Sequence, residues 1–284
     1  MSEISLDIGR SGCEIQLVKE KNPFIRKISS SLNYNVRLEC QCKKQNNFRL
    51  KSFKTPKIYN KGINSENLYF FDMEYIHGYN VCDFFSFASP SDISKLYSKL
   101  ENFLNSNILN SKKSDINSLV ENKVNDLNYI LKSNSYYSKN FKNKIFDYLF
   151  TRIPQTEIPI GYCHGDLTFS NILFKNIEEL YLIDFLDSFI DSPIIDLVKI
   201  RQDTKFHWTL LITKNLPQYK VLRVKQIFDY IDFNLMQFIE KNKNVKLWYY
   251  YLEILNLVRI MPYVDDINEI EFLKINLNKL IYKV

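Results

Sequence analysis

Histidine and glycine are scarce in this sequence, which has three histidines and six glycines among its 284 residues. None of the histidines, His77, His164 and His207, lies at metal-ligand spacing from the cysteines, and no CxxC pair occurs. A structural zinc site needs four such ligands, so this pattern argues against one. Reduced thiols are therefore expected at all five cysteines: Cys13, Cys40, Cys42, Cys82 and Cys163.

Long uninterrupted apolar runs are also missing. The stretch from Leu247 to Ile260 is broken by Glu253, Asn256 and Arg259, which excludes it as a membrane-spanning helix. The first residues have neither the basic start and apolar core nor the small-residue cleavage site of a secretory signal. These absences predict a cytoplasmic protein with no membrane partner.

The charge of the chain is moderately positive, with 38 Lys and Arg against 32 Asp and Glu and a net charge of +6. The lysines are scattered rather than gathered into a stripe, so we expect a solvated surface and no nucleic-acid partner. A composition of 45% hydrophobic and 25% charged residues can bury a sizeable core. One large domain, or two lobes that share a cleft, fits this length.

The first seventy or so residues show the pattern of a small sheet. Short runs rich in β-forming residues occur at Ile15–Val18, Phe24–Ile28 and Leu68–Phe71, separated by clusters of Gly, Pro, Asn and Lys. A helix is expected from about Asn33 to Gln45, because apolar residues there alternate with polar ones.

A helical period begins after Gly78. Pro90 and Ser91 start an apolar face at Ile93, Leu96, Tyr97, Leu100, Phe103 and Leu104. Further helices are predicted around 119–131, 141–149, 224–238, 247–258 and 269–283, with a short strand-loop-strand region at 160–185. We therefore predict an α+β fold with a small β-rich N-terminal lobe (1–73), a hinge (74–78) and a larger, mainly helical C-terminal lobe (79–284).

The most informative segment is His164-Gly-Asp-Leu-Thr-Phe-Ser-Asn171, which Asp184 follows thirteen residues later. Phosphoryl transfer needs a carboxylate that takes up the proton of an attacking hydroxyl, and oxygen ligands that hold Mg²⁺ against the phosphates. The apolar runs Ile172–Phe174 and Leu180–Ile183 read as two paired strands. Such a hairpin would carry Asn171 and Asp184 to the same end, within reach of one metal ion.

This segment resembles the aminoglycoside phosphotransferase and choline kinase family, whose members have the two-lobed protein-kinase-like fold. The resemblance implies that Asp166 is the catalytic base and that Asn171 and Asp184 bind magnesium. It implies that His164 braces the catalytic loop and that Asp196, in Ser192-Pro-Ile-Ile-Asp-Leu197, supports the same loop. The glycine-rich GxGxxG pattern of protein kinases is missing from the N-terminal region.

The N-terminal lobe offers candidates for holding the nucleotide. Ser11 and Gly12 precede a strand and are expected to approach the phosphates. By the period of two, Lys27 shares a face with Ile25 and would reach the α- and β-phosphates, whereas Arg26 would face away. By the family resemblance, Glu39 is the expected ion-pair partner of Lys27. Backbone groups of the hinge, at Glu74 and Ile76, would bind adenine.

The resulting prediction is an ATP- or GTP-dependent phosphotransferase that uses Mg²⁺ and a small-molecule hydroxyl acceptor, a sugar or an amino alcohol such as choline. The candidates for acceptor contacts are Asp187, Asp191, His207 and Trp208. Two alternatives stay open. One is a catalytically inactive kinase fold that serves as a binding module, and the other is a metal-dependent hydrolase built on His164, Asp166 and Asp184. The pattern gives no indication of oligomeric state.

Overall fold

The computed structural model describes residues 2–6, 13–49 and 52–282, which form two compact units. The first unit comprises Met1–Phe103, His164–Asp187 and Pro217–Ile227, and the second comprises Leu104–Cys163, Ser188–Leu216 and Phe228–Val284. The segment that carries the predicted catalytic loop thus belongs to the same unit as the N-terminal strands. The helices α3 (Pro90–Leu109) and α8 (Gln218–Lys241) contribute residues to both units. The lobe boundaries at residues 73 and 79 stay a prediction.

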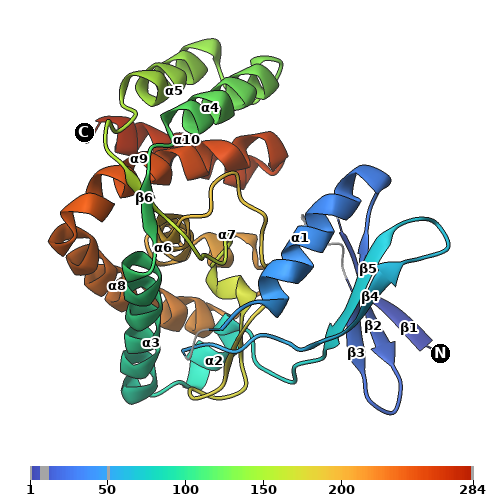
Figure 1. Cartoon of the computed structure of the whole chain (residues 1–284). Helices are drawn as coiled ribbons and strands as arrows, with labels where there is room; N and C mark the ends of the chain where they lie inside the picture. The colour runs from blue at the N-terminus through green and yellow to red at the C-terminus, as the bar shows by residue number, and fades with distance from the viewer. Residues whose placement is uncertain (1, 7–12, 50–51, 283–284) are drawn as a thin grey trace. The chain divides into compact units, whose positions relative to one another are not determined.

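A five-stranded antiparallel sheet forms the N-terminal part of the first unit (Figure 1). Its order is β1-β2-β3-β5-β4, and the strands are β1 (Ser2–Leu6), β2 (Cys13–Lys19), β3 (Phe24–Ser29), β4 (Ile58–Ile63) and β5 (Tyr69–Glu74). The helix α1 (Asn35–Asn46) packs on one face, where Leu38 and Cys42 join Ile25, Phe71 and Met73 in a buried apolar cluster. The predicted strands and helix in this region are confirmed.

The register of β3 separates its two basic side chains. Arg26 lies opposite Asp72 of β5, and the two side chains form paired hydrogen bonds of 2.7 and 2.9 Å. Lys27 is buried and lies opposite Phe71, whose ring belongs to the apolar cluster under α1. Because strand side chains alternate between faces, Lys27 and Arg26 point to opposite sides of the sheet.

A short hairpin, β8 (Ile172–Phe174) and β9 (Leu180–Leu182), follows a 3₁₀ turn at Phe169–Asn171. Ile172 pairs with Leu182 at its open end, so the residues that flank the hairpin, Asn171 and Ile183, are adjacent in the ladder. The backbone nitrogen of Ile183 donates to the carbonyl of Asn171 at 3.0 Å. The expected hairpin is therefore confirmed.

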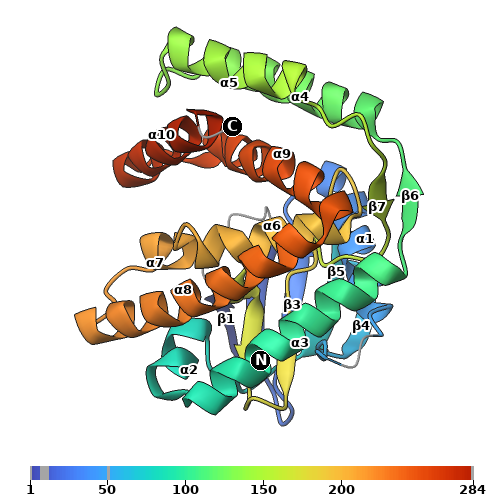
Figure 2. The same ribbon diagram turned by 90° about the vertical axis from the view of Figure 1, so that its left-hand side faces the viewer.

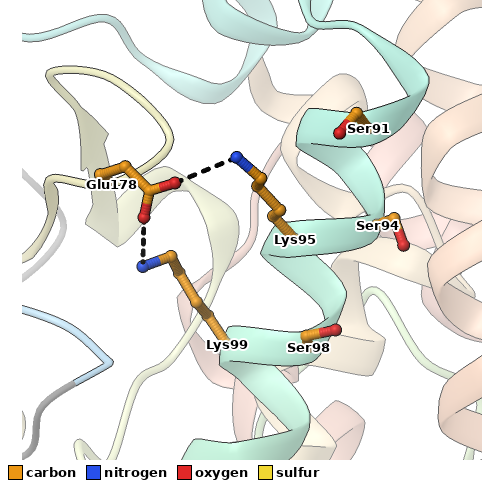
Figure 3. Close-up of a pocket in the computed structure, with 6 residues that line it drawn as sticks. All are labelled: Ser91, Ser94, Lys95, Ser98, Lys99 and Glu178. Atoms are coloured by element: carbon orange, nitrogen blue, oxygen red, sulfur yellow. Dashed lines mark hydrogen bonds and ion pairs between the residues drawn. The ribbon is translucent and has the colours of Figure 1, made fainter.

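The turn of this hairpin is held by ion pairs to neighbouring elements. Figure 3 shows Lys95 and Lys99 of α3 reaching the two carboxylate oxygens of Glu178, at 3.2 and 3.4 Å, beside Ser91, Ser94 and Ser98. Glu179 forms an ion pair with Lys54. The strands themselves are fixed by backbone hydrogen bonds from Tyr79 to Phe174 and from Lys54 to the carbonyl of Leu180, each of 2.8 Å. The hairpin is thus fixed at its turn and along both strands.

Helix α2 (Val81–Phe87) completes the first unit. Its Phe84 ring stacks on Phe174 of the hairpin with the ring centres 4.5 Å apart. The sequence pattern did not predict α2, because seven residues span too few turns to show a helical period.

The second unit is built from helices around an aromatic core. It contains α4 (Asn117–Lys132), α5 (Lys139–Thr151), α6 (Pro193–Thr204), α7 (Trp208–Ile212), α9 (Lys243–Ile260), α10 (Ile267–Tyr282) and a 3₁₀ turn at Met261–Tyr263. Figure 2 shows α4 and α5 side by side, and β6 (Lys112–Ser114) pairs with β7 (Ile158–Ile160). Trp248, Tyr249 and Tyr251 of α9 are fully buried, and the Trp248 indole donates to the carbonyl of Thr156 at 2.8 Å.

None of the helices in residues 2–6, 13–49 and 52–282 combines the length and apolar character that a membrane crossing requires. The five cysteines are free thiols, as expected.

Candidate active site

The predicted catalytic loop turns sharply at Gly165, whose φ of 90° is readily adopted only by glycine. This turn directs Asp166 and Asn171 toward each other. The Asn171 amide nitrogen donates to the Asp166 carboxylate at 3.1 Å and to the Asp166 backbone carbonyl at 2.8 Å. Because the amide nitrogen makes these bonds, the amide oxygen of Asn171 is left to act as a ligand.

His164 links the catalytic loop to the segment around Asp184. Its Nδ1 accepts a hydrogen bond from the Asp166 backbone nitrogen at 3.2 Å, so Nε2 carries the proton and donates to the Ile183 carbonyl at 2.8 Å. The His164 carbonyl accepts from the backbone nitrogen of Leu186 at 3.0 Å. One residue thus bonds to the chain on both sides of Asp184. The bracing role that the family resemblance implies for His164 stays a prediction.

Burial keeps the His164 imidazole neutral. The side chain is fully buried, and desolvation lowers its pKa from 6.5 to about 4 against the weaker opposing effect of Asp166. A protonated imidazole could not accept the Asp166 N–H bond. The electrostatics therefore preserve the hydrogen-bond pattern that holds the loop.

This lowered pKa predicts an acid-sensitive fold. The unfolded chain binds a proton at His164 below about pH 6.5, whereas the folded chain does so only near pH 4, so the free energy of unfolding should fall as pH drops through that window. The full loss from this one group is about 3 kcal/mol. Urea unfolding of wild type and His164→Gln between about pH 7 and about pH 4.5 measures the difference.

The control for this experiment is His77→Gln, which removes an exposed imidazole. It should keep the wild-type acid sensitivity, whereas His164→Gln should start less stable and lose part of the pH slope. An unchanged slope in His164→Gln would assign the acid sensitivity to other groups.

Asp184 occupies the segment after the hairpin with a φ of 61°, a left-handed conformation that Asp and Asn tolerate better than other non-glycine residues. Its carboxylate forms an ion pair with the Nζ of Lys27. The Lys27 side chain is 5% exposed and that of Asp184 33%, so the carboxylate is the partner more accessible to solvent. The structure thus brings Lys27 and Asp184 together in the first unit.

The expected ion pair between Lys27 and Glu39 is wrong. Lys27 binds Asp184, and Glu39 binds Lys43 at 2.6 Å, one turn further along α1. The buried face of α1 is formed by Leu38, Gln41, Cys42 and Gln45. Glu39 lies beside this face rather than on it, and an i, i+4 partner is available without burying the carboxylate.

The residue after Asp184 fixes this segment in an aromatic cluster. Phe185 is buried, and its ring centre lies 4.3 Å from that of His164. It also makes an edge-to-face contact with Phe48, with the ring centres 5.5 Å apart. Phe48 in turn stacks on Phe103 at 6.3 Å. Rings in contact on several sides hold the backbone of Asp184 in place, which offsets the cost of its left-handed conformation.

One contact near the site had no sequence signal. The Nζ of Lys44, on α1, donates to the Leu186 carbonyl at 3.1 Å and so connects α1 to the segment that follows Asp184. Lysines are numerous and scattered in this chain, and nothing in the pattern distinguishes Lys44 from the others.

The remaining nucleotide candidates are only partly described. Ser11 and Gly12 lie outside the described residues. Glu74 ends β5, and its backbone nitrogen donates to the backbone carbonyl of Lys57 at 2.8 Å. Ile76, two residues further along, is buried. Residues 75–78 form no helix or strand, as expected for a connecting segment. A role for Glu74 and Ile76 in binding adenine stays a prediction.

The residues predicted to support the loop and bind the acceptor are distributed over both units. His164 and the exposed Asp187 lie in the first unit, and the others lie in the second. Asp196 is fully buried in the first turn of α6, and Asp191 accepts a 3.5 Å contact from the Cys163 thiol. His207 lies 3.3 Å from Asp229, and Trp208 is buried against Phe272. The structure does not gather these side chains within one unit.

The oxygen atoms around the loop suit magnesium. The Asn171 amide oxygen and the Asp184 carboxylate flank the open end of the hairpin, and Mg²⁺ prefers a few such hard oxygen ligands together with water and phosphate. Within the described ranges, no group of three or more His, Cys, Asp and Glu side chains has the arrangement of a metal site. The two side chains therefore fit a magnesium ion whose remaining ligands are water and a bound substrate.

The comparisons with known proteins give one family-model match and several matches to solved structures. Residues 85–200, which contain Asp166, Asn171, Asp184 and Asp196, match the model of the ecdysteroid kinase-like family. A search of curated protein sequences finds no significant match.

Similar solved structures span nearly the whole chain. A thermostable mutant of aminoglycoside phosphotransferase APH(4)-Ia in its apo form has a TM-score of 0.63 at 10% identity, and the match covers 100% of this chain and 94% of that chain. A ternary complex of such a mutant with AMP-PNP and hygromycin B gives 0.64 at 10% identity, covering 99% and 93%.

A third structure, the GDP and kanamycin complex of APH(2")-IIia, has a TM-score of 0.60 at 16% identity and covers 99% of this chain and 93% of that chain. Identities this low establish a shared fold. The chain therefore has the two-lobed, protein-kinase-like α+β fold of the aminoglycoside phosphotransferases, and the expected fold is confirmed.

Proposed function

We propose that this protein is a small-molecule kinase that transfers the γ-phosphoryl group of ATP or GTP to a hydroxyl group. The observation that carries this proposal is the arrangement of four side chains in one compact unit. Asn171 bonds to the Asp166 carboxylate, and Lys27 forms an ion pair with Asp184 at the open end of the same hairpin. These are the groups that positioning and charge stabilisation in phosphoryl transfer require.

The roles follow from the surroundings of each group. Asp166 has one carboxylate oxygen bonded to Asn171, which fixes its orientation and supports its negative charge. It orients the acceptor hydroxyl and takes up its proton as the hydroxyl oxygen forms a bond to the γ-phosphorus. The bond from that phosphorus to the bridging oxygen breaks, and the nucleoside diphosphate leaves with the electron pair.

Lys27 and the two oxygen ligands hold the nucleotide. When a nucleotide is bound, Lys27 contacts its phosphates in place of Asp184. Asp184 and the Asn171 amide oxygen are the residues that would hold Mg²⁺, which neutralises charge on the phosphates when bound. His164 keeps both segments in register through its bonds to Asp166 and Ile183.

The acceptor that we propose is a sugar or an amino alcohol. The support for a small-molecule acceptor comes from structures of the same fold, two of which contain hygromycin B or kanamycin beside a nucleotide. An intact set of Asp166, Asn171 and Asp184 favours a kinase over an inactive binding module, because a scaffold needs neither the base nor the ligands. A metal-dependent hydrolase would need additional ligands, and the described residues contain no group of three or more His, Cys, Asp and Glu side chains that could hold a metal ion.

The test is a nucleotide-consumption assay with a panel of sugars and amino alcohols. ADP or GDP and a phosphorylated acceptor should form only when nucleotide, magnesium and one class of acceptor are all present. Hydrolysis of phosphate esters without a nucleotide would identify the hydrolase instead. Tight nucleotide binding without turnover on any acceptor, unchanged in Asp166→Asn, would support the inactive module.

Lys27 and its neighbour Arg26 form a matched pair for testing the nucleotide site. Lys27→Ala should weaken nucleotide binding or slow turnover by about tenfold or more, because a buried cation that contacts phosphates is removed. Arg26→Ala should leave nucleotide binding close to wild type, since its guanidinium binds Asp72 on the other face.

Isothermal titration with ADP, together with melting temperatures, separates these effects. Arg26→Ala loses a hydrogen-bonded ion pair, so its melting temperature should fall. Loss of nucleotide affinity in Arg26→Ala alone would mean that the wrong face of β3 has been assigned to the phosphates.

A further inference from the structure

The second unit contains a network of buried charges between α6, α8 and α9. Arg201 is 2% exposed and donates to both carboxylate oxygens of Asp232, each at 2.8 Å, and to the Tyr249 hydroxyl at 2.6 Å. Lys205 donates to both oxygens of Glu253 at 2.7 Å. Each carboxylate is occupied by partners in this network, so the network is internally satisfied.

A cavity of about 840 Å³ opens beside this network, entirely within the second unit. Its walls include the aromatic rings of Tyr148, Tyr250 and Tyr251 and the side chains of Met236 and Leu247. A volume of this size and a largely apolar wall with a few polar groups are typical of small-molecule binding sites. The cavity shares no residue with the predicted nucleotide and magnesium site.

The charged residues that line the cavity are all basic: Arg152, Arg201, Lys205 and Lys246. No carboxylate belongs to the described lining. Carboxylates outside the lining partner three of these cations, since Lys246 binds Glu240 at 2.6 Å and the other two belong to the buried network. The cavity surface itself therefore presents positive charge.

Arg152 differs from the other three cations. Within the described part of the chain, its guanidinium has no ion pair or hydrogen bond. It follows the last residue of α5, one turn after Tyr148, and its charge lowers the Tyr148 pKa against the larger effect of burial. The Tyr148 hydroxyl likewise has no hydrogen-bond partner among the described residues. One cation and one hydroxyl donor, one turn apart at the C-terminal end of α5, are thus left for a ligand.

We infer that this cavity is a binding site for a small amphipathic anion, a molecule with an aromatic or apolar body and one acidic group. The body would pack against Tyr250, Met236 and Leu247, and the acidic group would bind Arg152 and the Tyr148 hydroxyl. A charge-assisted hydrogen bond from arginine to an oxyanion gives the site its selectivity for anions. This inference does not depend on phosphotransferase activity.

The test compares two fluorescent probes that share one ring system. Anilinonaphthalene sulfonate carries an acidic group, and phenylnaphthylamine lacks it. The anionic probe should bind the full chain saturably, at one site, and about tenfold more tightly than the neutral one. Arg152→Gln should remove this difference in affinity, because it should weaken binding of the sulfonate probe and leave binding of the neutral probe unchanged. Lys139→Gln, which removes an exposed cation at the start of α5, should leave the affinity for both probes unchanged.

A second variant tests the cavity itself. Leu247 is 57% exposed at the cavity wall, so Leu247→Glu should fold. The new carboxylate should weaken binding of the anionic probe, because it repels the sulfonate group. Near-ultraviolet circular dichroism confirms that each variant retains packed aromatic side chains. Equal affinity for both probes in wild type, or sulfonate binding unchanged in both Arg152→Gln and Leu247→Glu, would overturn the inference. Asp166→Asn should bind both probes as wild type does, which keeps this result separate from the proposed function.

Discussion

Asp166→Asn should lower the rate of phosphoryl transfer by about 10² or more while nucleotide binding is retained. The substitution keeps the size of the side chain but removes its capacity to take up the proton of the acceptor hydroxyl. The hydrogen bond with Asn171 can persist, because the new amide can turn its oxygen toward the Asn171 nitrogen that now donates at 3.1 Å. The loop should therefore keep its shape and lose only its base.

Single-turnover rates and ADP affinity, measured side by side, check this expectation. Asp147→Asn is the matched control, because that carboxylate is exposed on α5 and makes no side-chain hydrogen bond within the described residues. A fall in affinity as large as the fall in rate would show that Asp166 holds the nucleotide rather than the proton. Full activity would remove Asp166 from the mechanism.

Asp184→Asn should also abolish most turnover, but for a different reason. A neutral amide is a poorer magnesium ligand than a carboxylate, so the metal should bind more weakly and higher magnesium should partly restore the rate. Asn is the most conservative choice for the backbone as well, because it tolerates the left-handed φ of 61° at this position.

Magnesium titrations of turnover distinguish the two aspartates. The apparent magnesium requirement should rise in Asp184→Asn and stay near wild type in Asp166→Asn. The variant also deprives the buried Lys27 of its charged partner, so a lower melting temperature is expected. Rescue of Asp166→Asn by magnesium, with Asp184→Asn indifferent to it, would exchange the two assignments.

Elements with a strong local pattern could be predicted from the sequence, and short ones could not. The strands β2, β3 and β5 and the long helices α3, α8 and α9 follow their periodicity. The edge strand β4 was missed because its middle residues lack β-forming side chains: Asn60 and Lys61 are polar and exposed, and Gly62 has no side chain. In α4, the apolar residues Leu119 and Ile130 are about half exposed, so the face that packs is narrower than the apolar pattern.

The candidate site shows the same division between local and long-range information. The hairpin that places Asn171 beside Ile183 follows from two short apolar runs, and the strand period correctly separates Lys27 from Arg26. The partner of Lys27 could not be read in this way. Choosing Asp184 over Glu39 depends on how α1 is rotated against the sheet, which tertiary packing decides and local sequence does not.

The ion pair between Lys27 and Asp184 implies that nucleotide and magnesium assist each other's binding. Under the proposed function, a phosphate replaces the carboxylate beside Lys27, and a metal ion replaces the ammonium beside Asp184. Either ligand alone breaks the internal pair and leaves one charge without a partner, whereas both together exchange one ion pair for two. The two affinities should therefore be thermodynamically linked, and by reciprocity each ligand should tighten the other by the same factor.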